Sequence, residues 1–140
     1  MNATKNAILI WDDKYSITEE IDEQHKHLFG IINELIGVID SLDTKEEDII
    51  RITEDLLAFK TLHFATEEKY FHLFNYEGTA AHEAAHEVFN QKAREFQEGD
   101  RGNPRVFAYD LVDFLENWLI GHVMGMDQQY KQCFLAHGLK

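Results

Sequence analysis

The chain has 140 residues, of which 44% are hydrophobic and 28% are charged, so it is long enough for one domain with a core and too short for two. Its formal net charge of −13 at pH 7 makes nucleic acid and anionic membrane surfaces unfavourable partners. Its single cysteine, Cys133, excludes an intrachain disulfide, and no segment resembles a signal peptide or a membrane span, so we expect a cytoplasmic protein without membrane insertion.

An N-terminal arm of about residues 1–17 is expected to precede the first helix. Within this arm, Ile8, Ile10 and Trp11 are the apolar residues available to pack on the bundle. The sequence Ser16-Ile17-Thr18-Glu19 fits a capping box, in which a hydroxyl side chain caps the first turn of a helix. The first helix is therefore expected to begin directly after the arm.

Three further helices are indicated by a second capping box at Thr44–Glu47, by Thr79, and by Asn103 before Pro104. The four helices are predicted at about 18–41, 45–73, 79–98 and 104–124, followed by a C-terminal tail. No run of residues alternates strictly enough to indicate a strand. Because the connections are short, the prediction is one all-α domain, an up-down-up-down antiparallel four-helix bundle with an N-terminal arm.

Histidines interrupt the apolar stripe of every predicted helix. At helical spacing the inward faces include six polar residues: His25, His63, Glu67, His82, His86 and His122. Burying one polar group without a partner costs about 2–7 kcal/mol, so six would exceed the stability of about 5–15 kcal/mol typical of a small domain. In an antiparallel bundle the five imidazoles gather near one end, which predicts a metal site. By the same helical phasing, His27 and His72 face away, and His137 lies in the tail.

The segment AHEAAHE, from Ala81 to Glu87, contains the HExxH pattern of zinc metalloproteases. A protease of this kind also needs a third downstream ligand and a sheet edge to align the peptide, and no strand is predicted. Zinc at His82 and His86 alone would leave the other buried polar residues without partners. Glu83 lies about 100° from His82 around the helix and is expected outside the site, so a zinc metalloprotease is the less favoured alternative.

A ferritin-like carboxylate oxidase is a second alternative, because such proteins use paired ExxH motifs. Glu83 and His86 supply one such motif, and the near match in the first helix ends at His25. The predicted site is rich in imidazole rather than carboxylate, and imidazole suits iron, copper and zinc alike. The ligand types therefore leave the metal open.

The chain resembles the hemerythrin family, specifically its single-domain bacterial members, the bacteriohemerythrins. The resemblance rests on IDEQH at Ile21–His25, HFATE at His63–Glu67, the pair His82 and His86, and HVMGMD at His122–Asp127, in the order of the family. It implies two non-heme iron ions joined by an oxo or hydroxo bridge. It also implies that one iron is bound by His82, His86 and His122, the other by His25 and His63, and both by the bridging carboxylates Glu67 and Asp127.

The implied ligands leave one coordination position open. Two six-coordinate metals offer twelve positions, and five imidazoles, two bridging carboxylates and a single-atom bridge fill eleven. The open position is on the two-histidine iron, where the family binds dioxygen. By family position Leu119 and Val123 form the wall of the oxygen pocket, and Phe64 and Trp118 flank the ligands.

Asp127 is the one implied ligand that helical periodicity does not select. It follows His122 by five residues, which is about 140° off the same face of a regular helix. The fourth helix is therefore expected to end, bulge or kink between them, and Gly125 is suited to allow this.

The function implied by the resemblance is reversible dioxygen binding for oxygen storage, transport or delivery. We expect a carrier rather than an enzyme, monomeric, with a protein recipient of oxygen that the sequence does not identify. The same di-iron site could instead serve oxygen or redox sensing, or peroxide or nitric oxide scavenging. The lack of an attached signalling domain favours the carrier.

Overall fold

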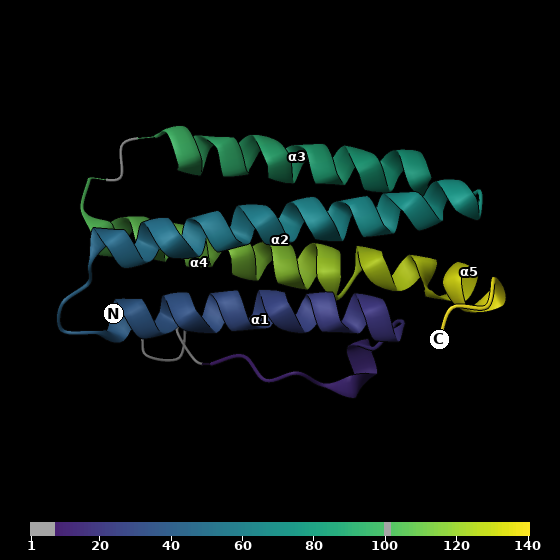
Figure 1. Cartoon of the computed structure of the whole chain (residues 1–140), viewed down its shortest axis with the longest axis horizontal. Helices are drawn as coiled ribbons and strands as arrows, with labels where there is room; N and C mark the ends of the chain where they lie inside the picture. Colours follow the sequence, from purple (N-terminus) through teal and green to yellow (C-terminus); the bar gives the residue numbers. More distant parts are fainter. Residues whose placement is uncertain (1–7, 100–101) are drawn as a thin grey trace.

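The computed structural model describes residues 8–99 and 102–140, and these form a bundle of four long helices (Figure 1). The helices are α1 (Glu19–Asp40), α2 (Glu46–Leu73), α3 (Thr79–Glu98) and α4 (Pro104–Trp118). Successive helices run in opposite directions; α1 packs on α2 and α4, and α2 packs on α3 (Figure 1). No strand occurs among the described residues. The predicted all-α antiparallel bundle is confirmed.

The apolar side chains form a large and a small cluster, and the inward histidines lie between them. On α1, His25 lies between Ile21 of the small cluster and Leu28 of the large one. On α2, His63 lies between Phe59 of the large cluster and Phe71 of the small one. Both ends of the polar region are therefore closed by packed hydrocarbon, which excludes water from it.

The helix starts agree with the predicted caps at α4 and differ from them at α1 and α2. The Asn103 side chain accepts hydrogen bonds from the first-turn N–H groups of α4, as predicted. At α1 the cap is Thr18, whose side chain accepts from the Ile21 N–H, while the Ser16 hydroxyl donates to Asp22. Thr44 does not cap α2, because its hydroxyl donates to the Val38 carbonyl at the end of α1 (3.1 Å).

The arm packs on α1 through only one of the three residues predicted for this role. Ile8 and Ile10 are 67% and 85% exposed, so the expectation that they pack on the bundle is wrong. Trp11 packs on the core as predicted, and Leu9 packs beside it in place of the two isoleucines. The Asn33 amide fixes this register, because it accepts from the Leu9 N–H (2.7 Å) and donates to the Leu9 carbonyl (2.9 Å). The predicted part of the arm before residue 8 lies outside the described residues.

The chain after α4 is more structured than predicted. The regular α-helix ends at Trp118, and a π-helical turn occupies Leu119–Val123, where a continuous helix to about residue 124 was expected. A 3₁₀ turn at Met126–Tyr130 and the short helix α5 (Lys131–Ala136) follow in the segment predicted as a tail. Within residues 8–99 and 102–140, no helix combines the length and apolar composition that crossing a bilayer requires.

Candidate metal centre

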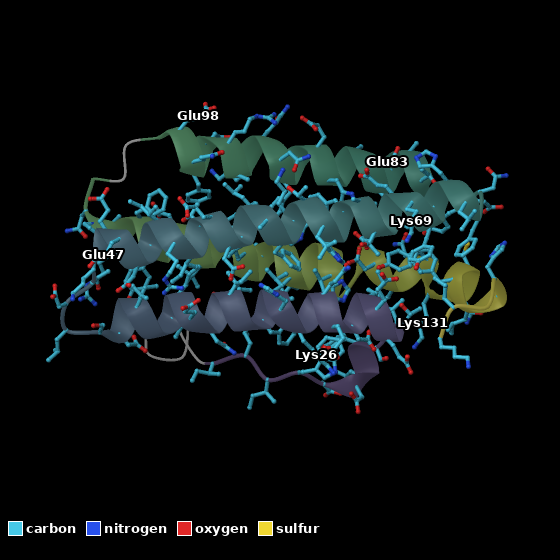
Figure 2. All side chains as sticks on the ribbon, viewed as in Figure 1. Lys26, Glu47, Lys69, Glu83, Glu98 and Lys131 are labelled. Atoms are coloured by element: carbon cyan, nitrogen blue, oxygen red, sulfur yellow. The ribbon has the colours of Figure 1, made fainter. Side chains whose placement is uncertain are left out.

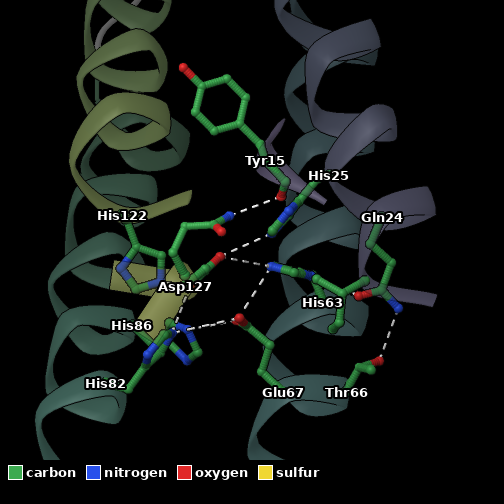
Figure 3. Close-up of polar contacts among 12 residues, drawn as sticks. Tyr15, Gln24, His25, His63, Thr66, Glu67, His82, His86, His122 and Asp127 are labelled. Carbon is green, nitrogen blue, oxygen red and sulfur yellow. Dashed lines mark hydrogen bonds and ion pairs between the residues drawn. The ribbon is translucent and has the colours of Figure 1, made fainter. Parts of the chain in front are cut away.

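The seven residues that the resemblance assigned as ligands come together inside the bundle (Figure 3). All of them are buried. They form two groups that share Glu67, and within each group the possible ligand atoms lie within 4.8 Å of one another. The first group is Glu67, His82, His86 and His122, and the second is His25, His63, Glu67 and Asp127.

The Asp127 carboxylate lies between histidines of the two groups. Its Oδ2 lies 3.0 Å from His25 Nε2, and its Oδ1 lies 2.9 Å from His82 Nε2 and 3.0 Å from His122 Nε2. Each oxygen therefore faces one group, which is the arrangement required of a carboxylate that bridges two metals.

Glu67 occupies the equivalent central place on α2. Its Oε1 lies 3.3 Å from His63 Nε2 and 3.0 Å from His86 Nε2, and its Oε2 lies 3.6 Å from His82 Nε2. Figure 3 shows the two carboxylates facing each other between the imidazoles. Each carboxylate thus contacts at least one histidine of the three-histidine group (His82, His86 and His122) and one of the two-histidine group (His25 and His63).

Many of these closely spaced atoms nevertheless lack a hydrogen bond. Atoms without a hydrogen-bond partner among the described residues include Nε2 of His63, His82, His86 and His122, together with both oxygens of Glu67. A buried polar group left unsatisfied costs about 1–3 kcal/mol. Donor atoms that point toward one another without forming hydrogen bonds can bind a cation between them. Imidazole together with carboxylate is a common donor set for transition metals.

The electrostatics of the cluster also favour bound positive charge. Burial would raise the pKa of Glu67, as would Asp127, but the surrounding histidines lower it to about 2. The pKa of Asp127 is likewise well below its usual range, because its contacts with histidines outweigh burial. Burial would lower the pKa of His82, but Asp127 and Glu67 raise it to about 9. Two ionised carboxylates therefore hold cationic charge in the core, which metal ions can supply in place of protons.

The outer nitrogens of two histidines are held by side chains that sequence reasoning did not identify. His63 Nδ1 lies 2.7 Å from Gln24 Oε1, whose amide nitrogen in turn donates to Thr66 (Figure 3). His86 Nδ1 lies 2.8 Å from Glu68 Oε2. In each pair Nδ1 carries the proton and donates it, so Nε2 keeps its lone pair for a metal. Adjacency was the available sequence signal, since Gln24 precedes His25 and Glu68 follows Glu67.

A buried tyrosine that the sequence did not single out also lies beside the carboxylates. Tyr130 is fully buried, and its ring centroid lies 5.5 Å from that of His82. Burial, together with the charges of Glu67 and Asp127, raises the pKa of its phenol well above the usual value. The hydroxyl therefore stays protonated and is available as a donor at the edge of the cluster.

The predicted irregularity before Asp127 exists, but it begins earlier than expected. His122 lies within the π-helical turn, where the Met124 N–H donates to the Leu119 carbonyl (2.8 Å) five residues back. The wider turn changes the phase of the chain, and the 3₁₀ turn then directs Asp127 inward. Gly125 joins the two turns at φ −114° and ψ −77°.

Replacing Gly125 by alanine should displace Asp127. A Cβ at Gly125 would lie 2.7 Å from the Gly121 carbonyl oxygen, which is backbone and cannot rotate away. We expect Gly125→Ala to lower the free energy of unfolding by about 1–3 kcal/mol and to reduce the metal content. Gly121→Ala is the matched control, because a Cβ there meets no atom within 4 Å. Equal metal content in both variants, measured by elemental analysis, would contradict the role given to Gly125.

The four predicted oxygen-pocket residues are all in the core or at its margin. Phe64 stacks on His86 with ring centroids 3.8 Å apart, and Trp118 stacks on His122 at 4.0 Å. Leu119 and Val123 are buried in the large apolar cluster. These aromatic contacts fall on the three-histidine group, whereas Phe59 stacks on His63 of the two-histidine group (5.3 Å). The role of Leu119 and Val123 as the wall of an oxygen pocket, with Phe64 and Trp118 flanking the ligands, stays a prediction.

The HEAAH segment does not form a protease site. The Glu83 carboxylate on α3 (Figure 2) lies 2.8 Å from Nε2 of the exposed His72 instead of facing the histidine cluster. His72 and His27 are exposed, as the helical phasing predicted, and His137 in the C-terminal segment is exposed as well. The pattern therefore reflects the spacing of His82 and His86, which do lie in the cluster.

Comparisons with known proteins agree with this arrangement. The family model described as Hemerythrin HHE cation binding domain matches residues 16–134. A Hemerythrin-like protein of Naegleria gruberi is 31% identical over 123 residues, covering 86% of this chain and 89% of the relative. A Bacteriohemerythrin of Stenotrophomonas maltophilia (strain R551-3) is 28% identical over 132 residues, covering 94% and 84%.

The fold is also that of solved hemerythrin structures. The crystal structure of a leucine-to-tyrosine mutant of hemerythrin superimposes with a TM-score of 0.74 at 23% identity, covering 91% of this chain and 97% of that one. The family match spans both groups of converging residues, from His25 to Asp127. The chain therefore belongs to the hemerythrin family and carries a cluster of histidines and carboxylates able to bind metal.

Proposed function

We propose that this protein binds dioxygen reversibly at a non-heme di-iron centre and serves as an oxygen carrier rather than an enzyme. The observation that carries the proposal is the uneven division of five buried imidazoles around two central carboxylates. With three imidazoles on one side and two on the other, one metal would have fewer protein ligands. A coordination position on that metal would then be free for a small exogenous ligand.

The ligand assignment follows the two groups. His82, His86 and His122 would hold one iron, His25 and His63 the other, and Glu67 and Asp127 would bridge them. When bound, the pair of ferrous ions supplies an open coordination position and two electrons that can be shared with dioxygen and recovered.

The protein's own part is to hold these ligands and to keep water out. Gln24 and Glu68 fix the tautomers of His63 and His86 through their Nδ1 atoms. The two apolar clusters close the site along the bundle axis. Slow access of water and protons favours release of dioxygen unchanged over its reduction, which supports a carrier over a scavenger.

The test is repeated oxygenation of the reduced protein. Iron-loaded protein is reduced under argon, mixed with oxygen, and returned to argon while its visible absorption is followed. We expect absorption that appears and disappears over several cycles, with no net oxygen consumption by an oxygen electrode. Continuous oxygen consumption in the presence of a reductant would indicate an oxidase or scavenger instead.

A further inference from the structure

A surface pocket of about 260 Å³ lies between α1 and α2, next to the two-histidine side of the cluster. Its walls include Gln24 and His27 from α1 and Asp55, Ala58, Phe59 and Leu62 from α2. Apolar atoms make up most of this surface; Leu62 is 60% exposed at its edge, and Phe59, which is 6% exposed, contributes a small part of its ring.

Two walls of this pocket touch the same candidate iron ligand. The Phe59 ring stacks on His63 with centroids 5.3 Å apart and an interplanar angle of 14°. The Phe59 ring also stacks on His27, with centroids 5.8 Å apart and an interplanar angle of 26°. The Gln24 amide oxygen lies 2.7 Å from His63 Nδ1. A molecule in the pocket would therefore be separated from a metal ligand by a single side chain.

The charges around the pocket restrict what it can hold. Glu23 and Asp55 are the carboxylates that line it, and the whole chain carries a formal charge of −13. Phosphate-bearing carriers such as nucleotides are therefore disfavoured. An aromatic wall with hydrogen-bonding groups at its edge, His27 and Asp55 (3.2 Å apart), suits a neutral planar ring that carries hydroxyl groups.

We infer that this pocket binds a neutral benzohydroquinone, which delivers electrons to the metal centre through Phe59 and His63. The inference rests on the proposed function, because a carrier whose irons have become ferric needs two electrons to bind dioxygen again. One hydroquinone supplies both: its two O–H bonds break, two C=O bonds form, and each ferric ion takes one electron. The two protons pass to water at the open mouth of the pocket, and the quinone leaves.

Binding is tested separately from electron transfer. The probe is 2,3-dimethoxy-5,6-dimethyl-1,4-benzoquinone, whose ring has no free position for addition of the Cys133 thiol. Its dissociation constant is measured by isothermal titration calorimetry on the iron-loaded ferric protein. We expect one site in the wild type, and at least about tenfold weaker binding in Ala58→Trp, since the indole would fill the pocket.

The matched control is Ala65→Trp on the same helix. Ala65 is exposed and lines a different groove, between α2 and α3, together with Phe64 and Glu68. Ala65→Trp should therefore bind the quinone as the wild type does. Leu62→Asp gives a second way to damage the pocket should Ala58→Trp fold poorly, because Leu62 is an exposed residue at its edge.

Electron transfer is then followed by stopped-flow under argon with the corresponding hydroquinone. The rate of ferric reduction should saturate with hydroquinone concentration in the wild type and in Ala65→Trp. It should fall about tenfold or more in Ala58→Trp at subsaturating hydroquinone, while reduction by dithionite is equal in all three. Phe59→Leu should slow reduction at saturating hydroquinone, because it removes the ring between pocket and ligand.

Three results would overturn the inference: no binding of the quinone to the wild type, equal binding in Ala58→Trp and Leu62→Asp, or a loss confined to Ala65→Trp. Calorimetry on the ferric protein does not depend on oxygen binding. Saturable quinone binding with failed oxygen cycling would therefore refute the carrier and leave the pocket standing. Reversible oxygen cycling without quinone binding would refute the quinone pocket and leave the carrier function standing.

Discussion

Loss of a single histidine from the cluster, in His63→Ala or His86→Ala, should empty the site and destabilise the fold. His86 Nε2 lies 3.0 Å from Glu67 Oε1, and its Nδ1 lies 2.8 Å from Glu68. Removing the imidazole takes away one ligand and leaves buried carboxylate oxygens without compensation, at about 1–3 kcal/mol for each unsatisfied group. A total loss of about 3 kcal/mol corresponds to a fall in Tm of about 10 °C.

The controls for this experiment are the three exposed histidines. His27→Ala, His72→Ala and His137→Ala should keep the metal content of the wild type, because none of these side chains enters the cluster. Metal content by elemental analysis and Tm by circular dichroism are the two readouts. Loss of metal from His72→Ala would mean that the outward orientation assigned to this residue on α2 is wrong.

Replacing Leu119 by alanine should speed the decay of the oxygenated protein to its ferric form. Leu119 is only 2% exposed and is the first residue of the π-helical turn that contains His122. Its removal would leave space for water beside the site without touching a candidate ligand. We expect normal iron content and an autoxidation half-life shortened about tenfold, which corresponds to a barrier lower by about 1.4 kcal/mol.

The adjacent Ile120 provides the control for this variant. Its side chain is 66% exposed, so Ile120→Ala changes the same turn without opening the core. The half-lives are compared by absorption after the reduced proteins are mixed with oxygen. An unchanged half-life in Leu119→Ala at full iron content would refute the role of Leu119 as a wall of the oxygen pocket.

Helical periodicity was sufficient to predict which residues converge, because burial repeats regularly along straight helices. It placed His25, His63, Glu67, His82, His86 and His122 on inward faces, and all six are buried in the structure. Asp127 came from the family resemblance alone. Its inward position depends on the π-helical and 3₁₀ turns, which interrupt the regular helical period. These turns are set by contacts with the rest of the bundle, which helical periodicity does not predict.

The errors at the arm and the helix starts have equally local causes. An extended arm points alternate residues to opposite sides, so one hydrogen-bonded contact decides which set is buried. Asn33 selects Leu9 over its neighbours Ile8 and Ile10. Likewise the Thr44 hydroxyl could either cap α2 or bond to α1, and it donates to the Val38 carbonyl near the end of α1. Gln24 and Glu68 could not be assigned because their partners, His63 and His86, lie on neighbouring helices.

The most direct test of the central claim is the metal content of the purified protein made with ample iron. The predicted result is two irons per chain, held by the two groups that share Glu67, with the charge-transfer absorption of an oxo-bridged ferric pair after exposure to air. One zinc per chain and a colourless protein would contradict the di-iron centre.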